Sequence, residues 1–329
     1  MKNLERYSRQ ILLPEIGEQG QQMIGHASVL IVGVGGLGTL VAQYLAMAGV
    51  GKIGLMDFDK VSESNLNRQV LYTEKDLGVV KVEAAKMRLT EINASLNYLT
   101  FNEILSTDNA KAIFSKFDLI IDGTDNIISK YIINDACNAL NKPWVYGSIY
   151  RFEGQVSVFN YENGPTYRCL YPENDNQVLS CEEAGVVGVV SATVAIQQAT
   201  EALKVILKKE NILSGKLLVT NVLSHKTAFF GIQKSNIETK KNKFQIPADA
   251  FILDVRNETE TPEADFENVL KIPMNILEEN TGKIPKDKTV YVLCQSGIRS
   301  AKAVEILKNN FGFENLINVA GGIFNLTKI

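Results

Sequence analysis

Short runs of apolar residues alternate with helical patterns along the first two thirds of the chain. Residues 29–32 form one such run, and a helical pattern follows over residues 37–48. Continuous apolar runs are typical of strands that are buried on both faces of a parallel sheet. The β-α-β alternation therefore predicts an α/β fold with helices on both faces of the sheet. Further predicted elements are strands at residues 52–56, 119–121, 144–146, 155–159 and 216–222 and helices at residues 128–140 and 192–208.

The pattern changes at residues 233–247, which are polar and basic and end at Pro247. Such a segment predicts an interdomain linker between a first domain at residues 1–232 and a second at residues 248–329. The second domain has a smaller α/β pattern. Its predicted strands are residues 251–253, 290–293 and 316–319, and its predicted helix is residues 300–310.

Composition and charge narrow the class of protein. With 34 basic and 37 acidic side chains, the formal net charge is −3, so we expect no charge-driven affinity for nucleic acid or for an anionic membrane. No apolar run approaches the ~18 residues that a membrane-spanning helix needs. The start of the chain has no apolar signal-peptide core, which predicts a cytoplasmic protein. The four cysteines are therefore expected as thiols, and two histidines are too few for a multi-histidine metal centre.

A glycine-rich turn follows the first predicted strand. Gly33, Gly35 and Gly38 spell G-x-G-x-x-G between a strand and a helix, where a bound phosphate approaches the backbone closely. Asp57 lies 19 residues past Gly38, at the end of the next strand, where it can accept hydrogen bonds from ribose hydroxyls. This constellation predicts an adenine-nucleotide site, with NAD as the default ligand.

A polar and cationic segment moves the interpretation away from NAD. Residues 64–69 follow the second predicted strand, and Lys81 comes shortly after them. Arg68 and Lys81 suit an enzyme that expels pyrophosphate, because the leaving group builds negative charge that cations neutralise. Asp122 and Asp125 follow a buried strand, and a carboxylate there can hold Mg²⁺ against a triphosphate. The alternative for each basic residue is an ordinary solvated charge.

Residues 4 to about 232 resemble the MoeB/ThiF/HesA family, the bacterial relatives of ubiquitin-activating enzymes. The resemblance implies a Rossmann-like domain that uses Mg·ATP to adenylate the C-terminal glycine of a ubiquitin-like sulfur-carrier protein ending in Gly-Gly. It also implies a homodimer. The stretches that carry it are residues 6–10, 33–38, 57–59 and 64–69, Lys81, and residues 124–126, 167–170 and 181–186.

The resemblance also implies roles for single residues. Arg9 would reach the nucleotide across the dimer interface, Asp57 would hold the ribose, and Asp125 would be the magnesium ligand. Asn65, Arg68 and Lys81 would contact the phosphates. The whole implied nucleotide set is Arg9, Gly33, Gly35, Gly36, Gly38, Asp57, Asp59, Ser64, Asn65, Leu66, Asn67, Arg68, Lys81, Asp125 and Asn126.

The cysteines depart from the family pattern in one respect. Relatives carry a structural zinc on two C-x-x-C pairs, whereas here Thr166 stands three residues before Cys169 and no cysteine lies between Cys181 and Cys294. One thiolate cannot build a four-coordinate zinc site, so we expect no zinc. Cys169 and Cys137 are expected as small buried side chains.

Cys181 matches the family cysteine near the adenylate, and two interpretations stay open. In the first it attacks the acyl adenylate or forms a disulfide-linked intermediate with the carrier. In the second it is a loop cysteine that turnover does not need. The neighbouring Glu182 and Glu183 disfavour the thiolate, which weakens the first interpretation slightly.

The second domain holds a cysteine in a different setting. Residues 294–300 read C-x-x-G-x-R-S between a strand and a helix, so backbone N–H groups and the helix N-terminus can point at the sulfur. With Arg299 adding positive charge, this loop favours a thiolate and can hold an anionic persulfide on Cys294. Residues 248–329 resemble a rhodanese domain, although this copy is short and lacks a clear leading helix.

The two halves together predict an adenylyltransferase joined to a sulfurtransferase. A persulfide on Cys294, loaded by a persulfide donor, would convert the acyl adenylate to a C-terminal thiocarboxylate, with Cys181 as a potential relay. The product could serve thiazole or molybdopterin synthesis or another pathway. Two alternatives are an NAD-dependent oxidoreductase and a sulfur-relay scaffold that binds partners without activating them.

Overall fold

The computed structural model describes residues 5–172, 185–235, 244–257, 260, 263–295, 297–323 and 326–328. The chain divides into two compact units, residues 1–237 and 238–329. None of the described helices is long and apolar enough to cross a membrane.

The first unit is built on one eight-stranded sheet with the strand order β3-β2-β1-β4-β5-β6-β7-β8. The first five strands in this order, β3, β2, β1, β4 and β5, are parallel to one another. Strands β6, β7 and β8 extend the sheet, and each is antiparallel to the strand before it. The strands are β1 (Ser28–Val32), β2 (Lys52–Met56), β3 (Asn97–Phe101), β4 (Leu119–Asp122), β5 (Trp144–Tyr150), β6 (Glu153–Phe159), β7 (Lys216–Asn221) and β8 (Lys226–Gly231).

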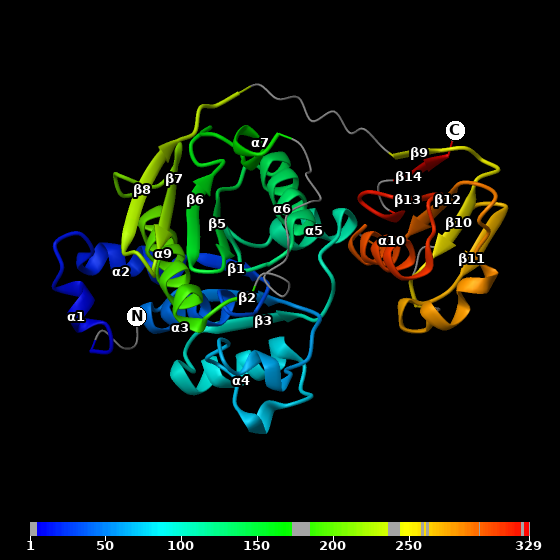
Figure 1. The fold of residues 1–329 in the computed structure, drawn as a ribbon. Helices are drawn as coiled ribbons and strands as arrows, with labels where there is room; N and C mark the ends of the chain where they lie inside the picture. Colours follow the sequence, from blue (N-terminus) through cyan, green and yellow to red (C-terminus); the bar gives the residue numbers. More distant parts are fainter. Residues whose placement is uncertain are drawn as a thin grey trace. The chain divides into compact units, whose positions relative to one another are not determined.

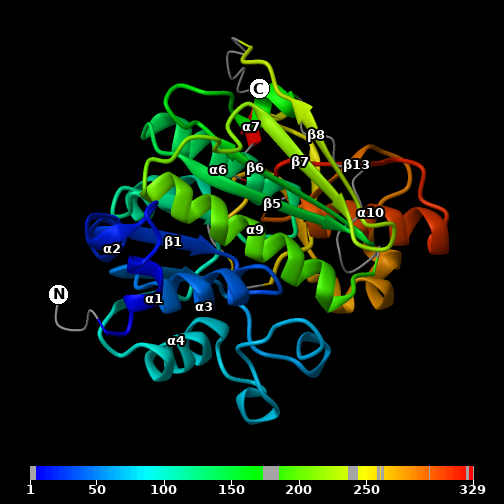
Figure 2. The same ribbon diagram turned by 90° about the vertical axis from the view of Figure 1, so that its left-hand side faces the viewer.

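Helices cover both faces of this sheet (Figure 1). Helices α3 and α9 pack together on one face, where Figure 2 shows them in front of the strands, and α5 and α6 pack on the other. The helices are α1 (Ser8–Ile11), α2 (Gly17–His26), α3 (Gly38–Ala48), α4 (Lys81–Ile92), α5 (Thr107–Phe114), α6 (Ile127–Ala139), α7 (Tyr167–Leu170) and α9 (Gly188–Ile206).

The apolar run of β1 explains why the sheet is buried on both sides. Val29 and Ile31 point into the core under α3 and α9, while Leu30 and Val32 point into the core under α5 and α6. All five residues of β1 are buried. The predicted β-α-β arrangement is confirmed, and each predicted strand and helix of this unit is present within a few residues of its expected ends.

The second unit has a four-stranded parallel sheet with the order β11-β10-β12-β13. Helix α10 (Ile298–Phe311) packs against β12 and β13. Strand β9 (Phe244–Ile246) pairs separately with β14 (Leu326–Lys328). The residues of β9 lie within the predicted linker, at residues 233–247. The sheet strands are β10 (Phe251–Asp254), β11 (Asn268–Lys271), β12 (Val290–Leu293) and β13 (Leu316–Asn318).

Candidate functional site

The glycine turn of the first unit is shaped by close backbone contacts. Gly33 has φ +85°, and a Cβ on it would lie 2.8 Å from the carbonyl of Gly123. A Cβ on Gly38 would lie 1.9 Å from the carbonyl oxygen of Gly33. Side chains cannot occupy these positions, so the turn after β1 packs directly against the loop after β4. The two loops meet at the carboxyl edge of parallel strands, where open α/β sheets bind ligands.

Asp57 lies beside this turn, at the end of β2. Its carboxylate accepts hydrogen bonds from the backbone N–H groups of Val34 (2.7 Å) and Asp59 (2.9 Å). Burial raises the pKa of this carboxyl group, and the charge of Lys81 and the two N–H groups oppose that rise. These bonds fix the carboxylate against the backbone of the glycine turn.

Lys81 begins α4 and pairs with Asp59. Its ammonium group lies 3.0 Å from the Asp59 carboxylate, and its backbone N–H donates to the Asp59 carbonyl at 2.9 Å. The lysine side chain is 8% exposed and the aspartate side chain 49%. The pair therefore keeps a nearly buried cation at the same edge of the sheet as Asp57.

Arg68 comes to the glycine turn from the 64–69 segment. A Cβ on Gly36 would lie 3.5 Å from Cγ of Arg68 and 3.1 Å from Oγ of Ser191, at the start of α9. The Arg68 guanidinium donates to the Ser64 carbonyl (2.8 Å) and to Oδ1 of Asn67 (3.1 Å). Sequence reasoning missed Ser191, because no local motif connects α9 to the turn.

Other predicted residues of this segment have structural partners. Asn65 is buried, and its side-chain oxygen accepts a hydrogen bond from the Ser62 N–H at 3.2 Å. The hydroxyl of Ser64 lies 3.1 Å from that of Ser62, and Leu66 packs against the core. A Cβ on Gly35 would lie 3.6 Å from the amide nitrogen of Gln69.

The loop after β4 is anchored by a buried ion pair. Asp122 is fully buried, and its carboxylate accepts hydrogen bonds from Lys130 (2.6 Å) and from the N–H and hydroxyl of Thr124 (2.9 and 2.6 Å). Asp122 is thus committed to the fold and is not a free metal ligand. Asp125 is exposed, while Asn126 caps α6 by accepting the Ser129 N–H at 2.8 Å.

Two predicted site residues of the first unit are not part of these loops. Arg9 is exposed on the short helix α1, and its predicted action across a dimer interface stays a prediction. Cys181 lies outside the described residues.

The remaining cysteines of this unit differ from each other. Cys137 is buried, as predicted, and burial raises the pKa of its thiol. Cys169 is only half-buried, so the prediction of a buried side chain is wrong there. Partial burial raises the pKa of the Cys169 thiol, but hydrogen bonds from Ser235 and Thr166 to the sulfur outweigh it and lower the pKa. No group of three metal-ligating side chains occurs among the residues that the structure describes.

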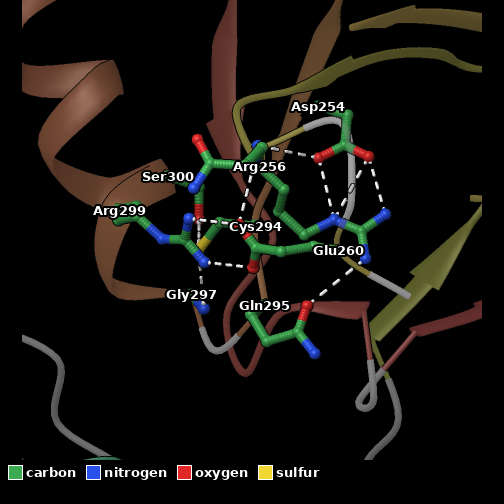
Figure 3. Close-up of polar contacts among 9 residues, drawn as sticks. Asp254, Arg256, Glu260, Cys294, Gln295, Gly297, Arg299 and Ser300 are labelled. Atoms are coloured by element: carbon green, nitrogen blue, oxygen red, sulfur yellow. Dashed lines mark hydrogen bonds and ion pairs between the residues drawn. The ribbon is translucent and has the colours of Figure 1, made fainter. Parts of the chain in front are cut away.

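The second unit places Cys294 in the predicted cradle (Figure 3). The sulfur is buried and accepts hydrogen bonds from the Gly297 N–H (3.1 Å) and the Ser300 hydroxyl (3.2 Å). Gly297 has φ +91°, and a Cβ there would lie 2.7 Å from the Gly321 nitrogen. Gly297 is therefore packed against the turn after β13, and its N–H is the one backbone donor to the sulfur among the described residues.

Arg299 does not act alone at this site. Its guanidinium forms a bidentate ion pair with Glu260, with both N–O distances at 2.6 Å. Arg256 is fully buried and pairs with Asp254 at 2.7 Å. Sequence reasoning missed Glu260, because a glutamate in a polar loop has no local signal of its partner.

The chain is similar to known proteins in sequence and in structure. Residues 7–243 match the ThiF family, and residues 234–328 match the rhodanese-like domain. A probable adenylyltransferase/sulfurtransferase MoeZ from Mycobacterium tuberculosis is 36% identical, over 98% of this chain and 92% of that protein. A probable molybdopterin-synthase adenylyltransferase from Porphyra purpurea is 35% identical, over 100% of this chain and 94% of that protein.

Solved structures resemble the first unit in fold. The crystal structure of E. coli MccB with ATP has a TM-score of 0.64 and 22% identity, and the match covers 72% of this chain and 74% of that one. At this identity the likeness concerns the fold: a mostly parallel sheet with helices on both faces.

Proposed function

The chain belongs to the ThiF family and carries a rhodanese-like domain, and on that premise we propose that it is an ATP-dependent adenylyltransferase joined to a sulfurtransferase. Its substrate is the C-terminal glycine carboxylate of a ubiquitin-like sulfur-carrier protein ending in Gly-Gly. The relative named for molybdopterin synthase favours a carrier of that pathway over one for thiazole synthesis.

The first reaction forms the acyl adenylate. An oxygen of the carrier's carboxylate attacks the α-phosphorus of ATP, an acyl–AMP bond forms, and pyrophosphate leaves. Lys81 and Arg68 offset the negative charge that grows on the leaving group. The observation that carries this proposal is the convergence of the glycine turn with Arg68, Ser191 and the loop that bears Asp125.

Asp125 suits a magnesium ion by its chemistry. It offers an exposed carboxylate on the loop that packs against the glycine turn, and magnesium prefers oxygen ligands. Magnesium, when bound, would neutralise charge on the triphosphate. Three of the four zinc-ligand positions that the resemblance implies are unfilled in this sequence, and the absence of zinc remains a prediction.

The second reaction moves sulfur to the carrier. The terminal sulfur of a Cys294 persulfide attacks the acyl carbonyl, AMP leaves, and an acyl disulfide links the carrier to Cys294. A thiol then attacks the Cys294 sulfur of that disulfide, the acyl S–S bond breaks, a new disulfide forms between this thiol and Cys294, and the carrier leaves as a thiocarboxylate. An external dithiol reductant then reduces the new disulfide and returns Cys294 to the thiol for the next cycle. Cys181 is our candidate for the attacking thiol, and the cradle of Gly297 and Ser300 supports the persulfide anion.

The two alternative functions, an NAD-dependent oxidoreductase and an inactive scaffold, predict different roles for the basic residues and different exchange activity. An NAD-dependent oxidoreductase gives Arg68 and Lys81 no task, and the similarity to named adenylyltransferases argues against it. A scaffold without activity would not exchange pyrophosphate into ATP.

ATP–pyrophosphate exchange with the carrier tests the adenylation step. Asp125→Ala should reduce exchange at least ~10-fold, since a charge-assisted contact contributes about 1.5–3 kcal/mol. Asp108→Ala, which removes an exposed carboxylate from α5 of the same unit, is the matched control and should leave exchange unchanged. Exchange near the wild-type rate in a folded Asp125→Ala variant would contradict the assignment.

A further inference from the structure

Arg299, five residues after Cys294, forms an ion pair with Glu260. Both terminal nitrogens of the guanidinium donate to the carboxylate, at 2.6 Å each. One carboxylate oxygen of Glu260 also accepts the backbone N–H of Asn257 at 2.9 Å, which fixes the carboxylate in its own loop. The Arg299 side chain is 36% exposed and that of Glu260 19%. Glu260, which is less exposed and is held by the Asn257 N–H, therefore determines where the Arg299 guanidinium lies.

Alternating charges extend from this pair into the unit. Arg256 lies close enough to Glu260 to lower the pKa of its carboxyl group, after the larger effect of the Arg299 hydrogen bonds and against partial burial. Arg256 is itself paired with Asp254, through three nitrogen–oxygen contacts of 2.7 to 3.2 Å. Two cations and two carboxylates thus balance one another around the Cys294 loop (Figure 3).

Arg299 also interacts electrostatically with Cys294. Hydrogen bonds to Glu260 raise the pKa of Arg299 most, and the Cys294 sulfur and Asp254 add to that rise. The guanidinium therefore interacts electrostatically with the Cys294 sulfur, while the Glu260 carboxylate already neutralises its charge. Removing Glu260 would leave the positive charge of Arg299 available to an anion at the sulfur.

We infer that Glu260 is a positioning residue that holds the Arg299 guanidinium beside Cys294 and offsets its charge, so that the site favours sulfur donors of low charge over dianionic ones such as thiosulfate. This inference rests on the proposed sulfurtransferase function and assigns its donor class.

The chemistry explains why charge decides between donors. With thiosulfate, the Cys294 thiolate attacks the sulfane sulfur, the S–S bond of thiosulfate breaks, a Cys294 persulfide forms, and sulfite leaves. This encounter gathers three negative charges. With cysteine persulfide, the thiolate takes the terminal sulfur, and cysteine leaves with the proton. The reacting end of that donor carries at most one negative charge, so it needs less positive charge from Arg299.

Sulfur loading of the full chain by the two donors tests the inference. In Glu260→Gln, kcat/KM for thiosulfate should rise about three- to tenfold. This range corresponds to a free energy between that of an exposed ion pair and that of a charge-assisted hydrogen bond. The kcat/KM for cysteine persulfide should stay within about twofold of wild type, a change smaller than the loss of one exposed ion pair would give. Glu267→Gln removes an exposed glutamate from the same stretch and should change neither value. Glu260→Asp keeps the charge and should keep the wild-type preference.

A second readout does not depend on turnover. The Cys294 thiolate absorbs in the ultraviolet, and subtracting the spectrum of the matching Cys294→Ser chain isolates it from the other thiols. The thiolate signal should appear at lower pH in Glu260→Gln than in wild type, and at higher pH in Arg299→Ala. An unchanged titration, or equal gains for both donors, would overturn the inference. If the wild-type chain takes no sulfur from either donor, the sulfurtransferase proposal fails, while the titration still decides whether Glu260 offsets Arg299.

Discussion

The buried ion pair of Asp122 and Lys130 gives the most demanding test of how the nucleotide loop is held. The Lys130 ammonium donates to the Asp122 carboxylate at 2.6 Å, to the Gly147 carbonyl at 2.8 Å and to the Thr124 carbonyl at 3.0 Å. The Lys130 side chain is 6% exposed and the Asp122 side chain is 0% exposed. Lys130→Met keeps most of the volume and removes all three donors.

The magnitude follows from burial. Breaking a buried pair by removing one partner costs about 3–5 kcal/mol, because the remaining charge is left without compensation. The two carbonyls that lose their donor add to this cost. We therefore expect Lys130→Met to lower the free energy of unfolding by about 3–5 kcal/mol. Pyrophosphate exchange should also fall, since the pair anchors the loop that bears Asp125.

Chemical denaturation, with exchange measured on the folded fraction, is the assay. Lys111→Met, an exposed lysine on α5, is the matched control and should change stability by less than about 0.5 kcal/mol. In Asp122→Asn with Lys130→Met, the loss should be smaller than the sum of the two single losses, because no charge is left buried. A loss below about 1 kcal/mol in Lys130→Met would refute the claim that removing Lys130 leaves the Asp122 carboxylate buried without a compensating charge.

Two further predictions concern assembly and metal. Mixing an Arg9→Ala chain with a Lys81→Ala chain should restore exchange, because one of the two sites in a mixed dimer keeps both residues; absence of rescue in demonstrated mixed dimers would count against action across the interface. Elemental analysis of the purified protein should find zinc well below one atom per chain, and a chelator should leave the unfolding transition in place; a stoichiometric, tightly held zinc would show that the interpretation of Thr166 and Cys169 is wrong.

Much of the fold follows from local sequence. Both faces of β1 are buried, so residues 29–32 of this strand form an uninterrupted apolar run, and that run is visible in the chain. The glycines of the turn are equally visible, because close backbone contacts exclude any side chain there. Strand β8 left no such pattern, since every residue of it is exposed and no alternation marks its faces.

The parts of the sites that escaped prediction depend on distant partners. Ser191 reaches the glycine turn from a helix far along the chain, and Lys130 is a lysine on a helix until the structure buries it against Asp122. Glu260 stands 39 positions from Arg299, in a loop whose polar residues look alike in sequence. Sequence patterns therefore indicated the loops and the candidate site residues, whereas the charged partners Lys130 and Glu260 became visible only through the packing of separate elements.

The central claim is that one chain both activates a carboxylate and supplies its sulfur from Cys294. The most direct measurement is the mass of the carrier's C-terminus after incubation with ATP and a persulfide donor, for the wild-type chain and for Cys294→Ser. The account predicts a thiocarboxylate with the wild-type chain, and an adenylating Cys294→Ser chain that makes thiocarboxylate only at the rate free sulfide allows. Thiocarboxylate formed at the wild-type rate by Cys294→Ser from the persulfide donor would contradict it.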